Sequence, residues 1–330
     1  MNRGRTVSTA GAVAAVAAVL VAPPAQAGEP AQVRAAGRAE GGAAVSFVSS
    51  LTGENEVAAP GDRDGRGLAF LRLRGDRLSF ALSYRGVAGP TAAVLQEARK
   101  GAEGPVRIPL SARRHSAGKA AESRTERSAE NGTVSGTVTV SDRRVRDALR
   151  KQPNGFSFNL LTAPFPHGAV RGQLHASTRP LDPDRALRHS VQARVLRGAQ
   201  VYACTRQSDG RHAFTQRNVR ARLEGGIAHF FAAPGPGGPP AWVAPDRSAV
   251  TGTVRSRTPN GAGNIPELAL DARQAGRPGG RLGSTEEVLR LNTVGGVAPT
   301  GTCDPAVRPE VAVPYRADYV FVGTVRTAGS

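Results

Sequence analysis

The residues best suited to chemistry lie in the second half of the chain, around one histidine. His229 is followed by Phe230 and Phe231, and Trp242 and Asp246 lie a short distance downstream. A histidine on an aromatic-rich strand, with a carboxylate in reach, could serve as a general base or as the polar group of a small-molecule pocket. A core strand whose histidine donates to a backbone carbonyl would have the same sequence. His229, Trp242 and Asp246 are therefore candidate binding residues, and we assign no catalytic residue.

Recognisable catalytic motifs are missing from the rest of the sequence. It has no Gly-x-Ser-x-Gly elbow, no His-Glu-x-x-His zinc helix and no Walker loop. We expect no cofactor, and a non-enzymatic protein is favoured. The competing hypothesis is a secreted enzyme whose pocket surrounds His229 and Trp242. Tyr315 and Tyr319, which alternate with Ala317 near the C-terminus, are expected to be packing groups.

Residues of metal-ligand type occur without metal-ligand spacing. His167 and His175 are eight positions apart with no third partner nearby, which favours turn or edge histidines. Four carboxylates cluster in one loop, at Glu54, Glu56, Asp62 and Asp64. They do not follow a calcium-loop pattern, and the arginines among them, Arg63 and Arg66, favour a turn with local ion pairs. We expect no metal site.

The only cysteines are Cys204 and Cys303. In an oxidising compartment they can join as a disulfide. Closing a loop of about 100 residues would stabilise the second half of the chain by about 5 kcal/mol in the chain-entropy model. A reactive thiol or a metal pair is the alternative, although no further Cys or His stands at ligand spacing.

The N-terminus has the three parts of a secretory signal peptide. Arg3 and Arg5 give a positive start, residues 10–22 form an apolar run, and Ala25-Gln26-Ala27 is a small-x-small cleavage site. The apolar run is shorter than the roughly 20 residues needed to cross a bilayer. We expect cleavage after Ala27, secretion, and no transmembrane segment.

The charge balance limits the choice of partners. The formal net charge of +18 falls to +16 when Arg3 and Arg5 leave with the signal peptide. Such a protein is attracted to anionic polymers. Nucleic acid is not expected, because the arginines are dispersed and aromatic residues make up only 5% of the chain. An anionic cell-envelope polymer or an acidic polysaccharide is the more plausible partner, although a solvated basic surface typical of a high-GC genome would look the same.

Period-two alternation predicts strands in the first half. Leu78, Phe80, Leu82 and Tyr84 alternate with smaller or polar residues, and Gly75-Asp76 makes a hairpin turn before them. One short helix, capped by Ser141 and running through Val145 and Leu149, is expected. Further alternating segments lie at 134–140, at 156–160 after the Asn154-Gly155 turn, and at 170–174. Short strands separated by turns indicate a β-sandwich or barrel. The polar stretch 112–131 is expected to be an exposed, mobile loop with a solvated His115.

Two motifs near the ends of this region resemble the CHRD domain family. They are "FVSSLTGENEV" at Phe47 to Val57 and "PHGAVRGQL" at Pro166 to Leu174. The family pattern usually has a His-x-His segment and a later His-Thr pair, where this chain has Val94-Leu95-Gln96 and Leu161-Thr162. If the fold is similar to that of copper-zinc superoxide dismutase, the missing histidines argue against a metal centre here.

The second half resembles a bacterial family without assigned function, DUF3455. The resemblance rests on collinear motifs that include "VYAC" at 201–204, His229, Trp242, "SAVTG" at 248–252, "LNTVGGVAP" at 291–299 and "VPYRADYVF" at 313–321. The family's cysteines coincide with Cys204 and Cys303, which supports the disulfide. The chain departs from the family in a Gly- and Pro-rich insert at 233–242.

These observations combine into one hypothesis. We expect a secreted, actinobacterial-like protein of all-β fold, with two β-sandwich or barrel-like domains and few short helices. Its parts are a signal peptide (1–27), a linker (28–43), a CHRD domain (44–176), a second linker (177–195) and a DUF3455 domain (196–326). The predicted function is non-enzymatic binding of an envelope or extracellular matrix component.

Overall fold

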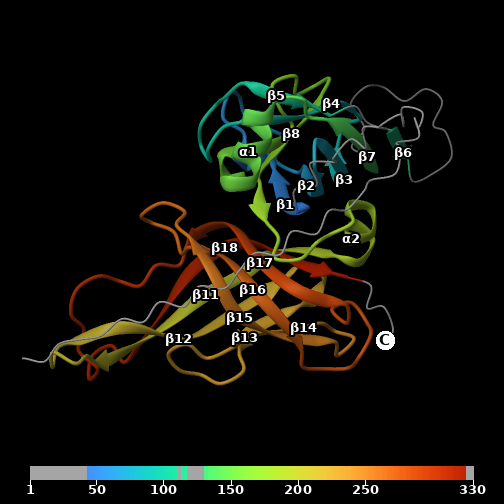
Figure 1. Ribbon diagram of the computed structural model, residues 1–330. Helices are drawn as coiled ribbons and strands as arrows, with labels where there is room; N and C mark the ends of the chain where they lie inside the picture. The colour runs from blue at the N-terminus through green and yellow to red at the C-terminus, as the bar shows by residue number, and fades with distance from the viewer. Residues whose placement is uncertain (1–42, 111–112, 117–129, 325–330) are drawn as a thin grey trace, which may run out of the picture. The chain divides into compact units, whose positions relative to one another are not determined.

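The computed structural model describes residues 43–110, 113–116 and 130–324. Over these residues the chain consists mainly of antiparallel strands, which confirms the all-β fold (Figure 1). The predicted signal peptide lies outside the described residues. Within them, no helix combines the length and the apolar composition that a membrane span requires.

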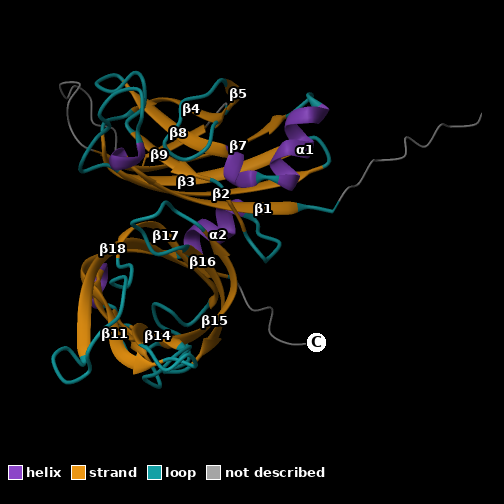
Figure 2. Cartoon of the chain, turned by 90° about the vertical axis from the view of Figure 1, so that its left-hand side faces the viewer, coloured by secondary structure: helices purple, strands orange, loops and turns teal. Residues whose placement is uncertain are grey.

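The first domain is one open antiparallel sheet. Its strands follow the order β5-β4-β8-β9-β1-β2-β3-β7-β6, with β10 paired to β1. The strands are β1 (Val45–Thr52), β2 (Arg66–Arg74), β3 (Arg77–Val87), β4 (Pro90–Glu97), β5 (Val106–Pro109), β6 (Arg113–Ser116), β7 (Glu130–Thr139), β8 (Phe156–Thr162), β9 (Val170–Gln173) and β10 (His175–Ala176). The sheet curves around its core as a half-barrel (Figure 2).

The core of this sheet follows the period-two pattern of the sequence. Leu78, Phe80 and Leu82 are almost completely buried, as alternation predicts. Helix α1 (Arg143–Lys151) buries Val145 and Leu149 against the same core. The helix is confirmed, but its N-cap is Asp142 rather than Ser141, because the Asp142 carboxylate accepts the backbone N–H of Arg144 at 2.8 Å. Two short 3-10 turns, η1 (Gly53–Asn55) and η2 (Pro153–Gly155), complete the domain.

Part of the predicted polar loop is a strand. Strand β6 pairs with β7, with His115 opposite Thr133, and β7 itself begins at Glu130. The loop prediction is therefore wrong for residues 113–116 and 130–131. Backbone pairing at the edge of a sheet needs no apolar periodicity, and periodicity was the property on which the prediction relied. Residues 117–129 lie outside the described part of the chain.

The second domain is a closed barrel of eight consecutive antiparallel strands (Figure 2). These are β11 (Val191–Arg206), β12 (His212–Leu223), β13 (Ala228–Phe231), β14 (Pro240–Val243), β15 (Ala249–Thr258), β16 (Glu267–Gln274), β17 (Thr285–Gly295) and β18 (Glu310–Gly323). A 3-10 turn, η3 (Glu224–Gly226), joins β12 to β13. Helix α2 (Pro183–His189) precedes the barrel, in the segment expected to be a linker.

Strands β17 and β18 are buried on both faces. Tyr315, Tyr319 and Phe321 of β18 belong to the core inside the barrel. The intervening Val320 and Val322 belong to a second apolar cluster, together with Leu289 and Leu291 of β17, Val48, Leu68 and Phe70 of the first sheet, and Leu181 and Ala186. The outer surface of the barrel therefore packs on the first domain, and both belong to one compact unit, Glu40–Ser330.

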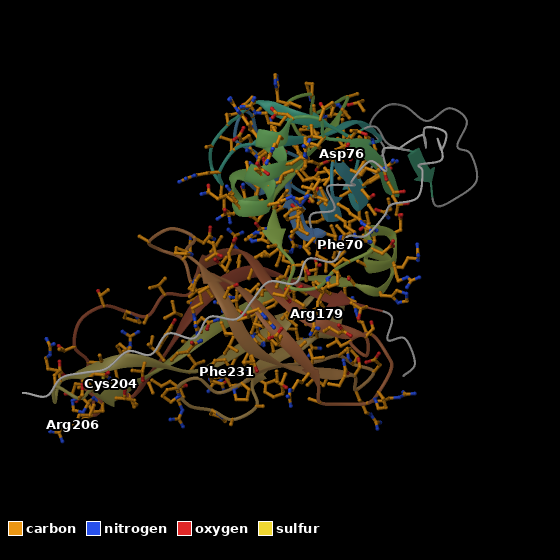
Figure 3. All side chains as sticks on the ribbon, in the orientation of Figure 1. Phe70, Asp76, Arg179, Cys204, Arg206 and Phe231 are labelled. Carbon is orange, nitrogen blue, oxygen red and sulfur yellow. A yellow bond between two sulfur atoms is a disulfide. The ribbon has the colours of Figure 1, made fainter. Side chains whose placement is uncertain are left out.

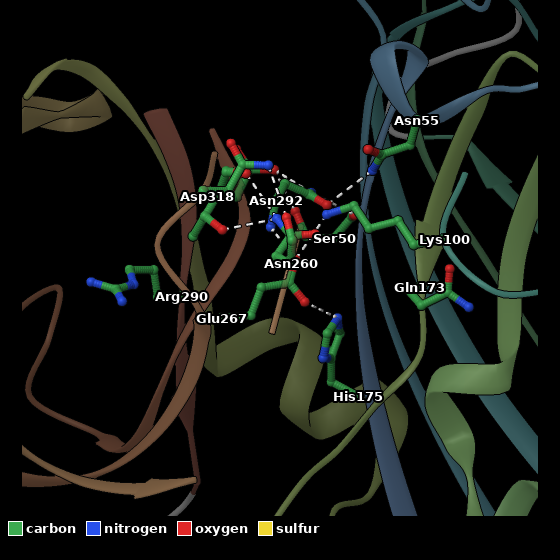
Figure 4. A network of polar contacts seen from close by, with 12 residues as sticks. Ser50, Asn55, Lys100, Gln173, His175, Asn260, Glu267, Arg290, Asn292 and Asp318 are labelled. Atoms are coloured by element: carbon green, nitrogen blue, oxygen red, sulfur yellow. Dashed lines mark hydrogen bonds and ion pairs between the residues drawn. The ribbon is translucent and has the colours of Figure 1, made fainter. Parts of the chain in front are cut away.

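A polar network borders this apolar contact (Figure 4). Lys100 Nζ donates to Glu267 Oε1 at 2.9 Å, and His175 Nε2 lies 3.5 Å from Glu267 Oε2. Asn55 Nδ2 donates to Asn292 Oδ1 at 3.0 Å. Asn292 has a positive φ of 50° within a register shift of β17, a conformation that asparagine tolerates better than most residues. The irregularity coincides with the place where β17 contacts the first domain.

The disulfide between Cys204 and Cys303 is present, with Cα atoms 5.9 Å apart. Cys204 is near the end of β11, where β11 and β12 continue as a long hairpin (Figure 3). Cys303 lies in the β17–β18 loop, and its N–H donates to His212 O at 3.1 Å. The bond therefore anchors that loop to the hairpin.

Candidate functional site

A cavity of about 440 Å³ lies inside the barrel and is lined by residues from all eight strands. Its apolar lining includes Val219, Phe231, Trp242, Val254, Leu268 and Leu270, and its polar lining includes Gln200, Tyr202, Gln216, His229, Arg257 and Arg290. An eight-stranded barrel is wide enough either to be filled by side chains or to hold one small ligand. This barrel does both, because its core also contains buried side chains that do not line the cavity, among them Ile227, Ala244 and Leu282.

His229 and Trp242 meet in this cavity. They are cross-strand partners on β13 and β14, and their rings stack with centroids 4.5 Å apart and planes 4° apart. Tyr319 meets both rings edge-on. The structure therefore brings together two of the three residues that the sequence suggested for binding.

His229 is held as a neutral imidazole. Its Nδ1 lies 2.9 Å from Ala241 O, and since a carbonyl can only accept, Nδ1 carries the proton. Burial lowers the pKa of His229 to about 3, although the bond to Ala241 opposes that shift. Among the described residues, no carboxylate hydrogen-bonds to this ring.

Asp246 is not part of the cavity lining. It lies in the turn between β14 and β15, where Oδ1 accepts from Ser248 Oγ at 2.6 Å and Oδ2 accepts from Arg281 N at 2.7 Å. These bonds hold the pKa of Asp246 at about 2. Its position follows from the course of the chain: β14 ends at Val243, and Asp246 lies in the turn that leads to β15, which Arg247 N closes by donating to Ala244 O at 3.0 Å.

The Gly- and Pro-rich insert forms part of the cavity wall. Gly237, Gly238, Pro239 and Pro240 all line it. A Cβ at Gly238 would lie 2.0 Å from Ala233 O, so this close turn requires glycine. The departure from the family pattern therefore lies directly at the candidate site.

Arg290 is the most unusual residue of the lining, and the sequence analysis missed it. It is only 8% exposed, and Nη2 donates to Pro266 O at 2.8 Å. Its Nε has no acceptor, and no ion pair joins Arg290 to any carboxylate of the described residues. In the structure Arg290 shares the inward face of β17 with Val288, whereas in the sequence it stands between the apolar Leu289 and Leu291 and follows no alternating pattern.

Other donors beside the cavity also lack acceptors. Trp242 Nε1 and Gln200 Nε2 are buried without a hydrogen-bond partner. Gln200 Oε1, in contrast, accepts from Gln216 Nε2 at 2.6 Å. Buried donors are rarely left unpaired in native proteins. The lining contains two arginines, and it contains no carboxylate, serine, cysteine or lysine among the residues the structure describes.

The first domain offers a smaller polar cluster. Glu56 turns inward, and Asn159 Nδ2 lies 3.5 Å from its Oε2. Burial raises the pKa of Glu56 to about 7, opposed by the charge of Arg171. Asp62, from the same carboxylate-rich loop, instead accepts the backbone N–H groups of Asp64 and Gly65. No group of three or more His, Cys, Asp or Glu residues in the described ranges could hold a metal ion.

Comparison with family models agrees with this architecture. Residues 47–174 match the CHRD domain, and residues 216–323 match a protein of unknown function, DUF3455. The chain therefore contains a CHRD region followed by a DUF3455 region. The CHRD match falls on the open sheet, and the DUF3455 match covers the barrel from β12 to the end of β18. No curated protein and no solved structure matched the chain.

Proposed function

We propose that this protein is a secreted, non-enzymatic binding protein, and that its DUF3455 barrel holds a small molecule from the cell envelope or the extracellular matrix. The observation that carries the proposal is the barrel cavity, which combines apolar walls with unpaired donors. Among the described residues its lining has no carboxylate, serine, cysteine or lysine, and its hydroxyl groups belong to Tyr202, Thr253 and Tyr319. Ligand sites commonly combine apolar walls with a few convergent polar groups.

The environment of His229 argues against the alternative, a secreted enzyme. A general base needs a reachable proton and a pKa near the working pH. The pKa of His229 is about 3, and the Nδ1 proton is directed to Ala241 O. Stacking on Trp242 further fixes the ring. These features suit a wall of a binding site better than a proton-transfer group.

A ligand-capture experiment tests the proposal. The purified protein is incubated with small-molecule extracts of cell envelope and of culture medium, and bound species are detected by native mass spectrometry. We expect one ligand per chain. Val254→Phe, which adds bulk inside the cavity, should lose it, whereas Val307→Phe, the same change at a site 80% exposed in the β17–β18 loop, should retain it.

Two results would contradict the proposal. Retention of the ligand by Val254→Phe would place the binding site outside the barrel. Chemical conversion of the bound molecule by the wild type, with loss of conversion in a His229 variant, would favour the enzyme.

A further inference from the structure

The cavity contains a buried positive charge that no carboxylate of the described residues neutralises. Arg290 is only 8% exposed, its Nε is unpaired, and its hydrogen-bond partners are neutral: the carbonyl of Pro266 and the hydroxyl of Tyr319. A guanidinium keeps its charge in proteins and offers five N–H donors. Burying such a group without a counter-ion is unfavourable.

The neighbouring side chains do not supply the missing negative charge. Burial raises the pKa of Tyr202, Tyr315 and Tyr319, so their hydroxyls stay neutral at physiological pH even beside Arg290. His229 is neutral as well. The remaining charged group of the lining is Arg257, which is exposed and adds a second positive charge. The cavity is therefore cationic, and apolar side chains form part of its walls.

We propose that the barrel cavity binds a small amphipathic monocarboxylate, whose carboxylate pairs with Arg290 and whose apolar body packs against Val254, Leu268 and Leu270. This inference rests on the proposed function and specifies its ligand class. The planar guanidinium matches a carboxylate in a bidentate arrangement, and such charge-assisted bonds are strong where water is excluded. Arg257 gives anions a favourable field on approach.

Matched acids and amides test the charge requirement. The chain has one tryptophan, and because it lines the cavity, its fluorescence reports occupancy directly. We would titrate decanoate against decanamide and 4-phenylbutyrate against its amide, at neutral pH. The wild type should bind each acid at least tenfold more tightly than its amide.

Arg290 variants then locate the charge that matters. Arg290→Met should bring the acid and the amide to within twofold of each other, and Arg290→Lys should give an intermediate ratio. Arg273→Gln removes one positive charge from an exposed position of β16 that does not line the cavity, so its ratio should equal that of the wild type. The melting temperature of ligand-free Arg290→Met should equal or exceed that of the wild type, because an unpaired buried charge has been removed.

The outcomes separate the two proposals. Equal binding of acid and amide by the wild type, or an unchanged ratio in folded Arg290→Met and Arg290→Lys, overturns the carboxylate inference and leaves the cavity as a binding site. If none of the four compounds changes the Trp242 emission while an extract ligand is captured in a Val254-dependent manner, the carboxylate inference alone fails. If the extracts also yield no ligand, both proposals fail.

Discussion

Ser50 of the CHRD domain donates a buried hydrogen bond of 2.9 Å from its Oγ to Asp318 Oδ2 of the barrel. Asn292 Nδ2 donates to the same oxygen at 2.7 Å. Ser50 and Asp318 lie 268 positions apart in sequence, so the Asp318 carboxylate forms part of the contact between the domains. Burial raises the pKa of Asp318, although both hydrogen bonds oppose the shift.

Substitution of Asp318 should separate the effect of its charge from that of its hydrogen bonds. Because the pKa of Asp318 is higher in the folded state, the folded protein binds this proton more strongly than the unfolded chain does. The resulting stabilisation is lost as pH rises above the ordinary aspartate value of 3.8. Asp318→Asn keeps an acceptor for Ser50 and should remove this pH dependence without loss of stability at pH 7. Asp318→Ala leaves two donors unpaired and should cost about 1–3 kcal/mol. Urea unfolding of both variants between pH 4 and 8 checks this, and equal destabilisation at pH 7 would contradict it.

Glu56 should give the CHRD domain its own pH dependence. Its folded pKa is about 7, against an ordinary value of 4.5 for a glutamate. The folded state therefore binds the proton more strongly, and stability should fall as pH rises from 4.5 to 7, by an amount on the order of 2 kcal/mol after allowance for partial exposure. Glu56→Gln should flatten this slope, whereas Glu54→Gln, at an exposed neighbour, should not. The measurement is the free energy of unfolding against pH.

His229 should make the barrel sensitive to acid. Because its folded pKa is about 3 and the reference value is 6.5, the stability linked to the neutral ring is present above pH 6.5 and is lost as pH falls toward 3. The complete loss would be on the order of 5 kcal/mol. His229→Phe keeps an aromatic ring beside Trp242 and should show a shallower acid unfolding transition. The emission of Trp242 monitors this transition. An unchanged transition would mean that other groups cause the acid sensitivity.

The disulfide should stabilise the barrel end that carries the β11–β12 hairpin. Cys204 and Cys303 are 99 positions apart, so the chain-entropy model predicts a loss of about 5 kcal/mol at most for Cys204→Ser. The Cys303→Ser variant and the double variant should lose the same amount, because each removes the same bond. Thermal unfolding of the three proteins checks this, and a milder effect in the double variant would point to an unpaired thiol as the cause.

The export prediction rests on residues before the folded domains. Cleavage after Ala27 would give a mature protein that begins at Gly28. N-terminal sequencing of the secreted chain should find this residue. A chain that retains Met1 would contradict secretion by this route, and Ala27→Arg, which removes the small residue at the cleavage site, should block processing.

The sequence allowed the strands to be predicted better than the site. Leu78, Phe80 and Leu82 fall on one buried face because alternation alone determines which side of a strand faces the core. The collinear family motifs likewise placed His229 and Trp242 in the same domain, and their pairing on β13 and β14 brings them into contact.

The role of Arg290 could not be predicted from the sequence, because only the closed barrel shows that this side chain lines the cavity. Its strand is apolar on both sides of it, since Leu289 and Leu291 face the CHRD domain while Val288 faces the barrel core. Period-two patterns are lost where both faces are buried. Asp246 shows the converse problem, because closeness in sequence suggested a carboxylate in reach of His229, whereas Asp246 lies in the β14–β15 turn and does not line the cavity.

The two faces of β17 and β18 also affect how the protein can be divided for experiments. The region that matches DUF3455 begins at residue 216, whereas β11, which starts at Val191, closes the barrel between β12 and β18. A fragment cut at the family boundary would expose two unpaired strand edges, and even one that begins at Val191 would expose Leu289, Leu291, Val320 and Val322 to water. Both fragments should aggregate, so studies of ligand uptake by the barrel require a protein that retains the CHRD sheet.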